Sequence, residues 1–340
     1  MNPTEDRLFS WVLGLGPKAK YNLSSSGLSE PDLSEMGVDT AYHDYGLEKN
    51  DHFRELEFAE EVATLYGVEP ENVVPTAGAS EAIFLVYSTL GAGRKALVPR
   101  PNYPAMFTVP KALGLEVSSS LASSRGGGVI VGLTDPNNPT GRLLDGSYTD
   151  WIASKGTVVF VNETYKGFAS SGPQATVFGK IPGAVVCSTM TKFFGLGRLR
   201  VGWVVADKRS SKRLLYAKWS VSGHDSEYSL WIATQVLKNR QRFADRARKL
   251  LSANTRLVRK FLAETEGVSA EIGVTPFCLV RYRNGPGSVT LARELFAKTG
   301  VLVSPGDFFG APKTFRLCFT VDEETLVLGL EELSKFFNRT

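Results

Sequence analysis

Apolar residues along the chain fall into short runs that alternate with stretches of helical periodicity. Residues 51–66 predict a helix, because Phe53, Leu56 and Ala59 recur near helical spacing and Gly67 follows as a stop. Further helices are expected over 81–90 and after the Pro/Asn turn at 101–104. Short apolar runs predict strands at 73–75, 96–98, 129–133, 157–161, 184–187 and 201–206. Strands that alternate with helices indicate crossover units, so we expect an α/β fold whose mostly parallel sheet carries helices on both faces.

The pattern changes after about residue 207. Two long basic helices are expected between 209 and 264. The elements that follow are strand candidates at 268–274 and 277–283, a helix at 289–298, strands at 300–303 and 314–320, and a last helix at 322–337. This order predicts a separate, smaller α+β domain. We therefore expect an N-terminal arm at 1–38 that belongs with the smaller lobe, a large domain at 39–220, and a small domain with its linking helices at 221–340.

Charge and hydropathy exclude several classes of function. The 340 residues carry 39 basic and 35 acidic side chains, and this net charge of +4 is too small to indicate nucleic-acid binding. The basic residues between 207 and 260 alternate with apolar ones, as on the solvated faces of long helices. No stretch approaches 18 uncharged apolar residues, and the first residues lack a basic segment followed by an apolar core. Neither a membrane span nor a secretory signal is therefore expected.

The cysteines and histidines give no sign of a metal site. Cys187, Cys278 and Cys318 are far apart in sequence and lack metal-type spacing. An odd, sparse set of cysteines fits a reducing cytoplasm, and we expect three buried thiols. The three histidines do not cluster either, so no metal is expected.

Polar residues follow several predicted strands, where ligands of such sheets bind. Gly78, Ala79 and Ser80 stand between a strand and a helix. Small residues let an anion approach the free N–H groups of a helix N-terminus, although a simple N-cap explains Ser80 equally well. Two prolines and a glycine make a rigid turn at 135–141 that fixes the place of Asn138, and a plain turn is the alternative. Asn162 ends the next apolar strand, where a polar group must find a partner.

Lys192 is the most reactive candidate. It stands beside Phe193 and Phe194 and between two strand-like runs. Desolvation lowers the pKa of a lysine and frees its amine as a nucleophile toward carbonyls, whereas a lysine that reaches solvent would have no such role. The glycines at 195 and 197 are followed by Arg200 where a dinucleotide fingerprint needs its third glycine, so that motif is excluded.

Taken together and in this order, these segments resemble the fold-type I aminotransferases that depend on pyridoxal 5′-phosphate (PLP), in particular the class I/II group that includes aspartate and histidinol-phosphate aminotransferases. The resemblance spans residues 40–320. It implies the large domain of a PLP-dependent transferase, with a sheet of the seven-stranded type. It also implies an enzyme that moves an amino group between an amino acid and a 2-oxo acid.

The resemblance assigns cofactor contacts to eleven residues, Tyr45 among them. Lys192 matches the lysine that forms the internal aldimine, and it is the expected general base. The phosphate-binding residues implied are Gly78, Ala79, Ser80, Thr189 and Arg200. Arginine suits this role because its guanidinium is a fixed-charge fork. The residues implied around the ring are Tyr103 as a stacking aromatic, Asn138 and Tyr165 at the phenolic oxygen, and Asn162 at the ring nitrogen. By its position alone, Tyr103 is more typical of packing than of stacking. Lys192, Tyr165 and Asn162 are the implied catalytic residues.

Substrate contacts and a partner follow from the same resemblance. Arg316 matches the arginine that binds the substrate α-carboxylate, together with Asn138. An arginine within an apolar strand needs a partner, and an internal salt bridge is the alternative. Gly27 lies in a segment that resembles the loop closing over the substrate. Tyr45, or else Tyr42, matches a tyrosine lent to the neighbouring subunit, which implies a homodimer with shared active sites.

Two residues depart from the family pattern. Asn162 stands where the family has an aspartate that keeps the pyridine nitrogen protonated, and Arg198 stands where a glycine is usual. A protonated ring withdraws electrons from the substrate carbanion, and a neutral asparagine stabilises that charge less. Glu163 substituting for the aspartate, a slow or specialised transaminase, and a lyase- or decarboxylase-type PLP reaction are all compatible with Asn162. A PLP-binding relative without catalytic activity is a further alternative. The sequence does not identify the amino acid, and Arg198 has either a surface role or a substrate contact.

Overall fold

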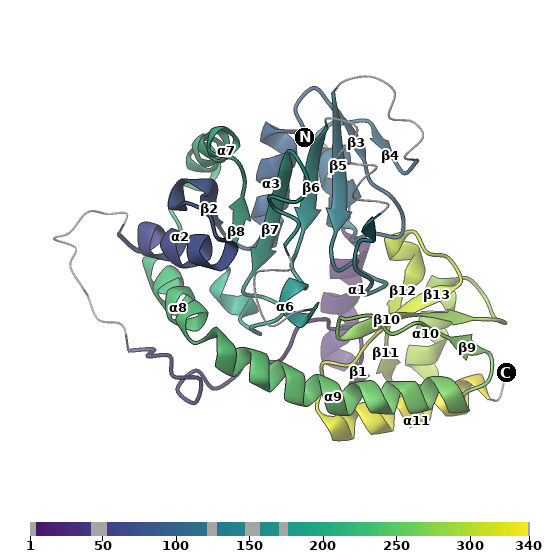
Figure 1. Cartoon of the computed structure of the whole chain (residues 1–340). Helices are drawn as coiled ribbons and strands as arrows, with labels where there is room; N and C mark the ends of the chain where they lie inside the picture. Colours follow the sequence, from purple (N-terminus) through teal and green to yellow (C-terminus); the bar gives the residue numbers. More distant parts are fainter. Residues whose placement is uncertain (1–4, 42–52, 121–127, 147–156, 170–175, 339–340) are drawn as a thin grey trace.

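A seven-stranded sheet forms the larger half of the molecule (Figure 1). The computed structural model describes residues 5–41, 53–120, 128–146, 157–169 and 176–338. The strands of the sheet, in order across it, are β2 (Val73–Thr76), β8 (Gly202–Val205), β7 (Ala184–Thr189), β6 (Val158–Asn162), β5 (Val129–Thr134), β3 (Lys95–Leu97) and β4 (Val117–Ser118). Only β8 runs against its two neighbours, β2 and β7. The other four pairings are parallel, which confirms the expected mostly parallel sheet of seven strands.

Both faces of this sheet are buried, as continuous apolar strands predict. Alternate residues of β5, such as Val129 and Ile130, enter different cores. One core contains residues of α3 (Ala79–Thr89), α4 (Ala105–Ala112) and α7 (Lys208–Val221). The opposite core contains residues of α2 (Phe53–Tyr66) and α8 (Glu227–Lys238). Helices therefore cover both faces of the sheet.

The second lobe is built on an antiparallel sheet with its own core. Its strands are β12 (Ser304–Pro305), β13 (Thr314–Cys318), β10 (Phe277–Tyr282) and β9 (Val268–Ser269). Its helices are α9 (Arg240–Glu264), α10 (Ser288–Thr299) and α11 (Glu323–Phe337). The long helix α9 spans both halves, because Phe243 packs in the core of the large sheet and Phe261 in that of the second lobe. Figure 1 shows α9 passing beneath the large sheet to lie beside α11.

The N-terminal arm packs with the second lobe. Leu8 and Trp11 of α1 (Arg7–Leu15) belong to its core, and β1 (Tyr21–Asn22) pairs in parallel with β11 (Val301–Leu302). In Figure 1 helix α1 lies between the large sheet and the second lobe. The division of the chain at residues 38 and 220 stays a prediction.

The main difference from the expected elements is the number of helices after residue 207. Three helices, α7, α8 and α9, replace the two long ones. Gly223 adopts φ +65° after α7, and the Ser226 side chain accepts a hydrogen bond from Ser229 N to begin α8, so a turn separates the two. Helix α1 and the two-residue strands β1 and β4 were not expected either. Short helical segments complete the described fold: η1 (Gly16–Lys18), η2 (Pro70–Asn72), α6 (Lys166–Ala169), η5 (Gly197–Leu199) and η6 (Gly306–Phe309).

The three cysteines are free and buried, as expected from their number and spacing. Among the helices that the structure describes, none is both long and apolar enough to cross a membrane.

Candidate active site

The predicted site residues meet at one edge of the large sheet. Thr134, Asn162 and Thr189 end the neighbouring parallel strands β5, β6 and β7. Because β2 runs parallel to β7 on the far side of β8, its end at Thr76 lies at the same edge, and Gly202 pairs with both Thr76 and Thr189. The loops after these strands surround a cavity of about 290 Å³. The cavity is lined by Ala79, Ser80, Tyr103, Asn138, Asn162, Tyr165, Thr189, Lys192, Arg200 and Arg316, together with residues of the N-terminal arm.

Lys192 presents its amine to this cavity from the loop after β7. Burial and the nearby cation of Arg316 lower the pKa of Lys192 from 10.5 to about 8. A substantial fraction of the amine is therefore neutral near pH 8. Gly27 lies against this side chain, since a Cβ at Gly27 would be 3.3 Å from Lys192 Cδ and 3.1 Å from the Thr191 carbonyl oxygen. The absence of a side chain at Gly27 thus lets the N-terminal arm approach the lysine closely.

Arg316 is a buried cation that faces the same cavity from β13. Its side chain is 2% exposed, and its Nη atoms donate to Asn138 Oδ1 and to the Ser24 carbonyl oxygen, both at 2.9 Å. Its buried Nε has no hydrogen-bond partner in the described part of the chain, and no carboxylate there pairs with it. The internal salt bridge that the sequence left open is therefore not found among the described residues. A buried guanidinium without an anion is costly, and a bound carboxylate would satisfy it.

The opposite end of the cavity has the donors for a second anion. Gly78 adopts φ +83° before the first turn of α3, and a Cβ there would stand 2.8 Å from Arg200 Nη2. Glycine is therefore needed for the guanidinium to lie against the loop. Arg200 itself has φ 55°, a conformation that costs about 1–2 kcal/mol for a residue with a side chain. It donates to the Ala77 and Gly197 carbonyl oxygens. This strained position directs a fixed cation toward the N–H groups that begin α3.

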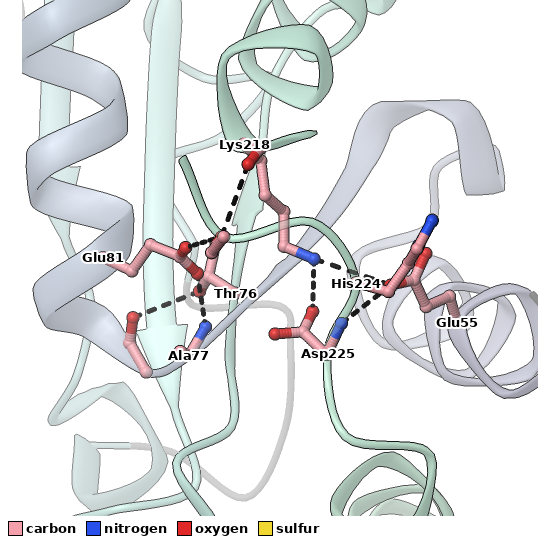
Figure 2. A network of polar contacts seen from close by, with 9 residues as sticks. Glu55, Thr76, Ala77, Glu81, Lys218, His224 and Asp225 are labelled. Atoms are coloured by element: carbon pink, nitrogen blue, oxygen red, sulfur yellow. Dashed lines mark hydrogen bonds and ion pairs between the residues drawn. The ribbon is translucent and has the colours of Figure 1, made fainter. Parts of the chain in front are cut away.

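A network of polar contacts outside the cavity supports the loop that precedes α3 (Figure 2). The Glu81 carboxylate accepts a hydrogen bond from Ala77 N at 2.6 Å and another from Ser222 Oγ. Ser222 follows directly after α7, so the carboxylate joins the end of that helix to the loop that precedes α3. The backbone of the anion-binding loop is thereby fixed by a side chain that does not line the cavity.

Lys218 forms the buried part of the same network. Its side chain is 1% exposed, and its Nζ lies 2.7 Å from Asp225 and 3.5 Å from Glu55. Burial works against the ionisation of Glu55, but the N–H of Asp225 and the Lys218 cation hold the pKa of Glu55 below its usual value. The ion pair links α7 to α2, and it could not be recognised from the sequence because Lys218 lies within a run of basic helix residues.

Asn162 and Glu163 point to different places. Asn162 lines the cavity and accepts a hydrogen bond from Thr164 N at 3.0 Å through Oδ1. The Glu163 carboxylate is fully buried and accepts hydrogen bonds from Thr176 Oγ1 and Val177 N. Burial raises the pKa of Glu163 to about 7. Because these partners hold Glu163 away from the Lys192 cavity, the geometry does not support its substitution for an aspartate at position 162.

Two tyrosines border the space between the lysine and the loops. The Tyr165 hydroxyl is 2.7 Å from Ser26 Oγ, and burial raises the pKa of Tyr165 to about 12 despite the nearby Arg316 cation. Tyr103 is half-buried, and its N–H donates to Asn102 Oδ1, which fixes the start of α4. Thr189 donates its hydroxyl to the Val201 carbonyl oxygen at 2.8 Å. Because burial raises the pKa of both Tyr165 and Tyr103, both tyrosines remain protonated at neutral pH and can donate hydrogen bonds.

Helix α1 contributes cavity residues that sequence reasoning missed. Leu8, Phe9 and Val12 line the cavity, and Ser24 of the following segment does so too. A signal for the helix itself was present in the sequence, because Asp6 precedes an amphipathic run. Asp6 caps α1 by accepting hydrogen bonds from Leu8 N and Phe9 N.

Arg198 is not among the residues that line the cavity. Arg198 is 90% exposed and pairs weakly with Glu30 at 3.6 Å, so the structure favours its surface role. Tyr45, and its alternative Tyr42, lie outside the described residues.

The donor set of the cavity fits PLP. A reactive amine, an anion site at Gly78 and Arg200, and a neutral hydrogen-bonding group at Asn162 surround one space. The buried Nε of Arg316, which has no hydrogen-bond partner among the described residues, leaves a separate place for a carboxylate.

Comparisons with known proteins agree with this fit. Residues 50–333 match the family model for aminotransferase class I and II. A histidinol-phosphate aminotransferase of Chlorobaculum tepidum is 26% identical over 71% of this chain and 72% of its own length. An LL-diaminopimelate aminotransferase of Natranaerobius thermophilus is 25% identical over 94% of this chain and 92% of its own. The crystal structure of a PLP-dependent aminotransferase from Streptococcus suis shares the fold, with a TM-score of 0.88 and 24% identity over 100% of this chain and 99% of that one. The chain therefore belongs to the class I and II aminotransferases and is a PLP-dependent enzyme of that family.

Proposed function

We propose that this enzyme transfers the amino group of an amino acid to a 2-oxo acid, with Lys192 as the residue that binds the cofactor covalently. The observation that carries the proposal is the joint presence of an amine of lowered pKa and a buried, incompletely satisfied guanidinium in one cavity. The amine suits reaction with a carbonyl, and the guanidinium suits an α-carboxylate.

Each residue has a distinct task in this scheme. Bound PLP supplies an electron-withdrawing ring that stabilises negative charge at the substrate Cα. Arg316 and Asn138, already joined at 2.9 Å, hold the substrate carboxylate and so fix the Cα position. Lys192, neutral in part because of its lowered pKa, would act as the general base that takes up the Cα proton. Arg200 and the N–H groups of Ala79 and Ser80 hold the phosphate.

Ring contacts complete the assignment. Tyr103, Tyr165 and Asn162 line the cavity and would hold the ring of PLP, Tyr103 by stacking and the other two by hydrogen bonds. The hydrogen bond between Tyr165 and Ser26 supports a positioning role for the N-terminal arm. Thr189 assists at the phosphate, and Gly27 lets the arm close over the substrate beside Lys192.

Asn162 favours a second candidate, a lyase- or decarboxylase-type reaction of the same cofactor. A neutral amide holds a ring nitrogen without fixing its positive charge, which weakens the electron sink. Such a reaction releases ammonia, carbon dioxide or a side-chain fragment and needs no 2-oxo acid.

We further propose a homodimer in the cytoplasm. The support for the dimer is the match of Tyr45 to a residue that family members share across their interface. The support for the cytoplasm is the set of three free, buried cysteines.

The absorbance spectrum of the purified protein with PLP separates these possibilities. Transamination predicts that an amino acid removes the visible band and that a 2-oxo acid restores it. Lys192→Ala should not show this cycle, whereas the control Lys208→Ala, at an exposed position of α7, should. Loss of the band without recovery, together with released ammonia or carbon dioxide, would favour the second candidate.

A further inference from the structure

Few charged residues line the described part of the cavity, and each already has a role that does not depend on the substrate side chain. Among the described lining residues the only charged side chains are Lys192, Arg200 and Arg316, and all three are basic. In the proposed function Lys192 binds the cofactor, Arg200 binds its phosphate and Arg316 binds the α-carboxylate. None of these cations is left for a second acidic group at the end of a substrate side chain.

Helix α1 supplies an apolar part of the cavity wall. Leu8 and Val12 are four residues apart and Phe9 and Val12 three, so the three side chains share one face of the helix. Leu8 is buried, Val12 is half-buried, and Phe9 is 49% exposed at the rim. A side chain bound here would meet hydrocarbon on one side.

The wall is held firmly in place. Trp11 Nε1 donates to the Val303 carbonyl oxygen at 2.9 Å, and the Trp11 ring packs edge-on against Phe308 at 5.8 Å. Asp6 caps the helix at the other end. These contacts fix α1 to the second lobe independently of any ligand, so its apolar face is a preformed part of the cavity.

Asp6, an acidic residue at the start of this wall, serves mainly to begin helix α1. The Asp6 carboxylate accepts from two backbone N–H groups at 3.0 Å, which is its capping role. Burial raises the pKa of Tyr103 and the Asp6 charge adds to this effect, so Asp6 acts on the cavity from a distance. Its charge disfavours an acidic substrate side chain, and because Asp6 does not line the cavity, it is not placed to pair directly with a basic one.

We propose that the substrate is an amino acid with an uncharged, apolar side chain, and that Leu8, Phe9 and Val12 select it. The inference rests on the proposed transamination, because it takes Arg316 as the α-carboxylate site. A carboxylate or ammonium group in the side chain would lose water at this wall without gaining a partner.

Binding of unreactive carboxylates to the PLP-loaded protein tests the inference without any turnover. The probes are 4-methylpentanoate, glutarate and 5-aminopentanoate, which share a carboxylate and a similar length but end in a branched methyl group, an anion and a cation. We expect 4-methylpentanoate to bind about tenfold tighter than either other probe by calorimetry, since burial of its two terminal carbons favours the apolar wall. Equal or tighter binding of glutarate or 5-aminopentanoate would overturn the inference.

Two matched substitutions on α1 locate the selectivity. Phe9→Arg brings a cation to the rim of the cavity and should reverse the preference between 4-methylpentanoate and glutarate. Leu13→Arg adds the same charge one turn away, at a side chain that is 70% exposed and does not line the cavity, and should leave the ratio unchanged. An equal change in both variants would contradict selection by the wall.

The rates of the first half-reaction separate this inference from the proposed function. Leucine or phenylalanine should convert the bound cofactor faster than glutamate or ornithine, and these rates also decide the question if none of the carboxylates binds measurably. If glutamate or ornithine reacts fastest, the apolar class is wrong while transamination stands. If no amino acid converts the cofactor, the proposed function itself fails.

Discussion

Replacing Asn162 by aspartate tests the most unusual residue of the site. Asn162 is 4% exposed, and its Oδ1 accepts from Thr164 N at 3.0 Å, which leaves the other half of the amide for the cavity. Asparagine and aspartate have nearly the same shape, so Asn162→Asp changes charge with little change in packing. The new carboxylate keeps the acceptor for Thr164 and gains the ability to stabilise a protonated ring nitrogen.

The expected magnitudes follow from the two environments of position 162. A hydrogen bond to a charged group contributes about 1.5–3 kcal/mol, against about 1 kcal/mol for a neutral one, so the gain with PLP bound is about 0.5–2 kcal/mol. This corresponds to a rise in the rate of the first half-reaction of about 2- to 30-fold, because 1.4 kcal/mol is a factor of ten. Without PLP the buried carboxylate lacks this partner and lies one residue from Glu163, so the apoprotein should lose about 1–3 kcal/mol of stability.

Stopped-flow absorbance measures the half-reaction at saturating amino acid, and urea unfolding measures stability with and without PLP. We expect a faster half-reaction and a larger gain in stability on adding PLP for Asn162→Asp than for the native protein. An unchanged or slower half-reaction in a variant that still binds PLP would show that the neutral amide is not what limits the electron sink.

Four other perturbations follow from the charges of the structure. The pKa of Lys192 is lowered to about 8, so the unfolded chain binds more protons between pH 8 and 10.5; apoprotein stability should rise over this window relative to Lys192→Met, as measured by urea unfolding at each pH. The pKa of Glu163 is raised to about 7, so the native protein should lose stability relative to Glu163→Gln as pH rises from 4.5 through 7, as followed by thermal unfolding. Lys218→Met leaves two carboxylates without their buried partner and should cost about 3–5 kcal/mol in urea unfolding, whereas the exposed control Lys212→Met should cost little. Arg316→Met should raise the KM for the amino acid far more than it weakens PLP binding, as measured by steady-state kinetics and a PLP titration. Comparable losses of affinity for the amino acid and for PLP would show that Arg316 serves the cofactor instead.

The order of strands and helices in the large domain was predictable because its apolar runs are short, buried on both faces and separated by clear turns. The strand end at Asn162 could therefore be placed at the ligand-binding edge of the sheet from the sequence. The break between α7 and α8 was missed, although Gly223 marks the turn and Ser226 caps the start of α8. Two-residue strands such as β1 and β4 carry too little periodicity to be recognised.

The residues of the candidate site likewise divide into those that the sequence could identify and those that needed the structure. Lys192, Asn138 and Arg316 were identified because each belongs to a local motif whose chemistry is unusual for its position. Leu8 and Phe9 could not be identified in this way, since their place in the cavity depends on the docking of α1 between two halves of the chain that are far apart in sequence. The choice between Asn162 and Glu163 likewise needed coordinates, because only the partners of Glu163 at Thr176 and Val177 show where its carboxylate points.

The most direct test of the account is to identify the residue that carries the cofactor. The PLP-loaded protein is reduced with borohydride, digested and mapped by mass spectrometry. We predict that the phosphopyridoxyl group is found on Lys192, and that Lys192→Ala carries none while it remains folded. A modification on another lysine, or none in the native protein after incubation with PLP, would contradict the central claim.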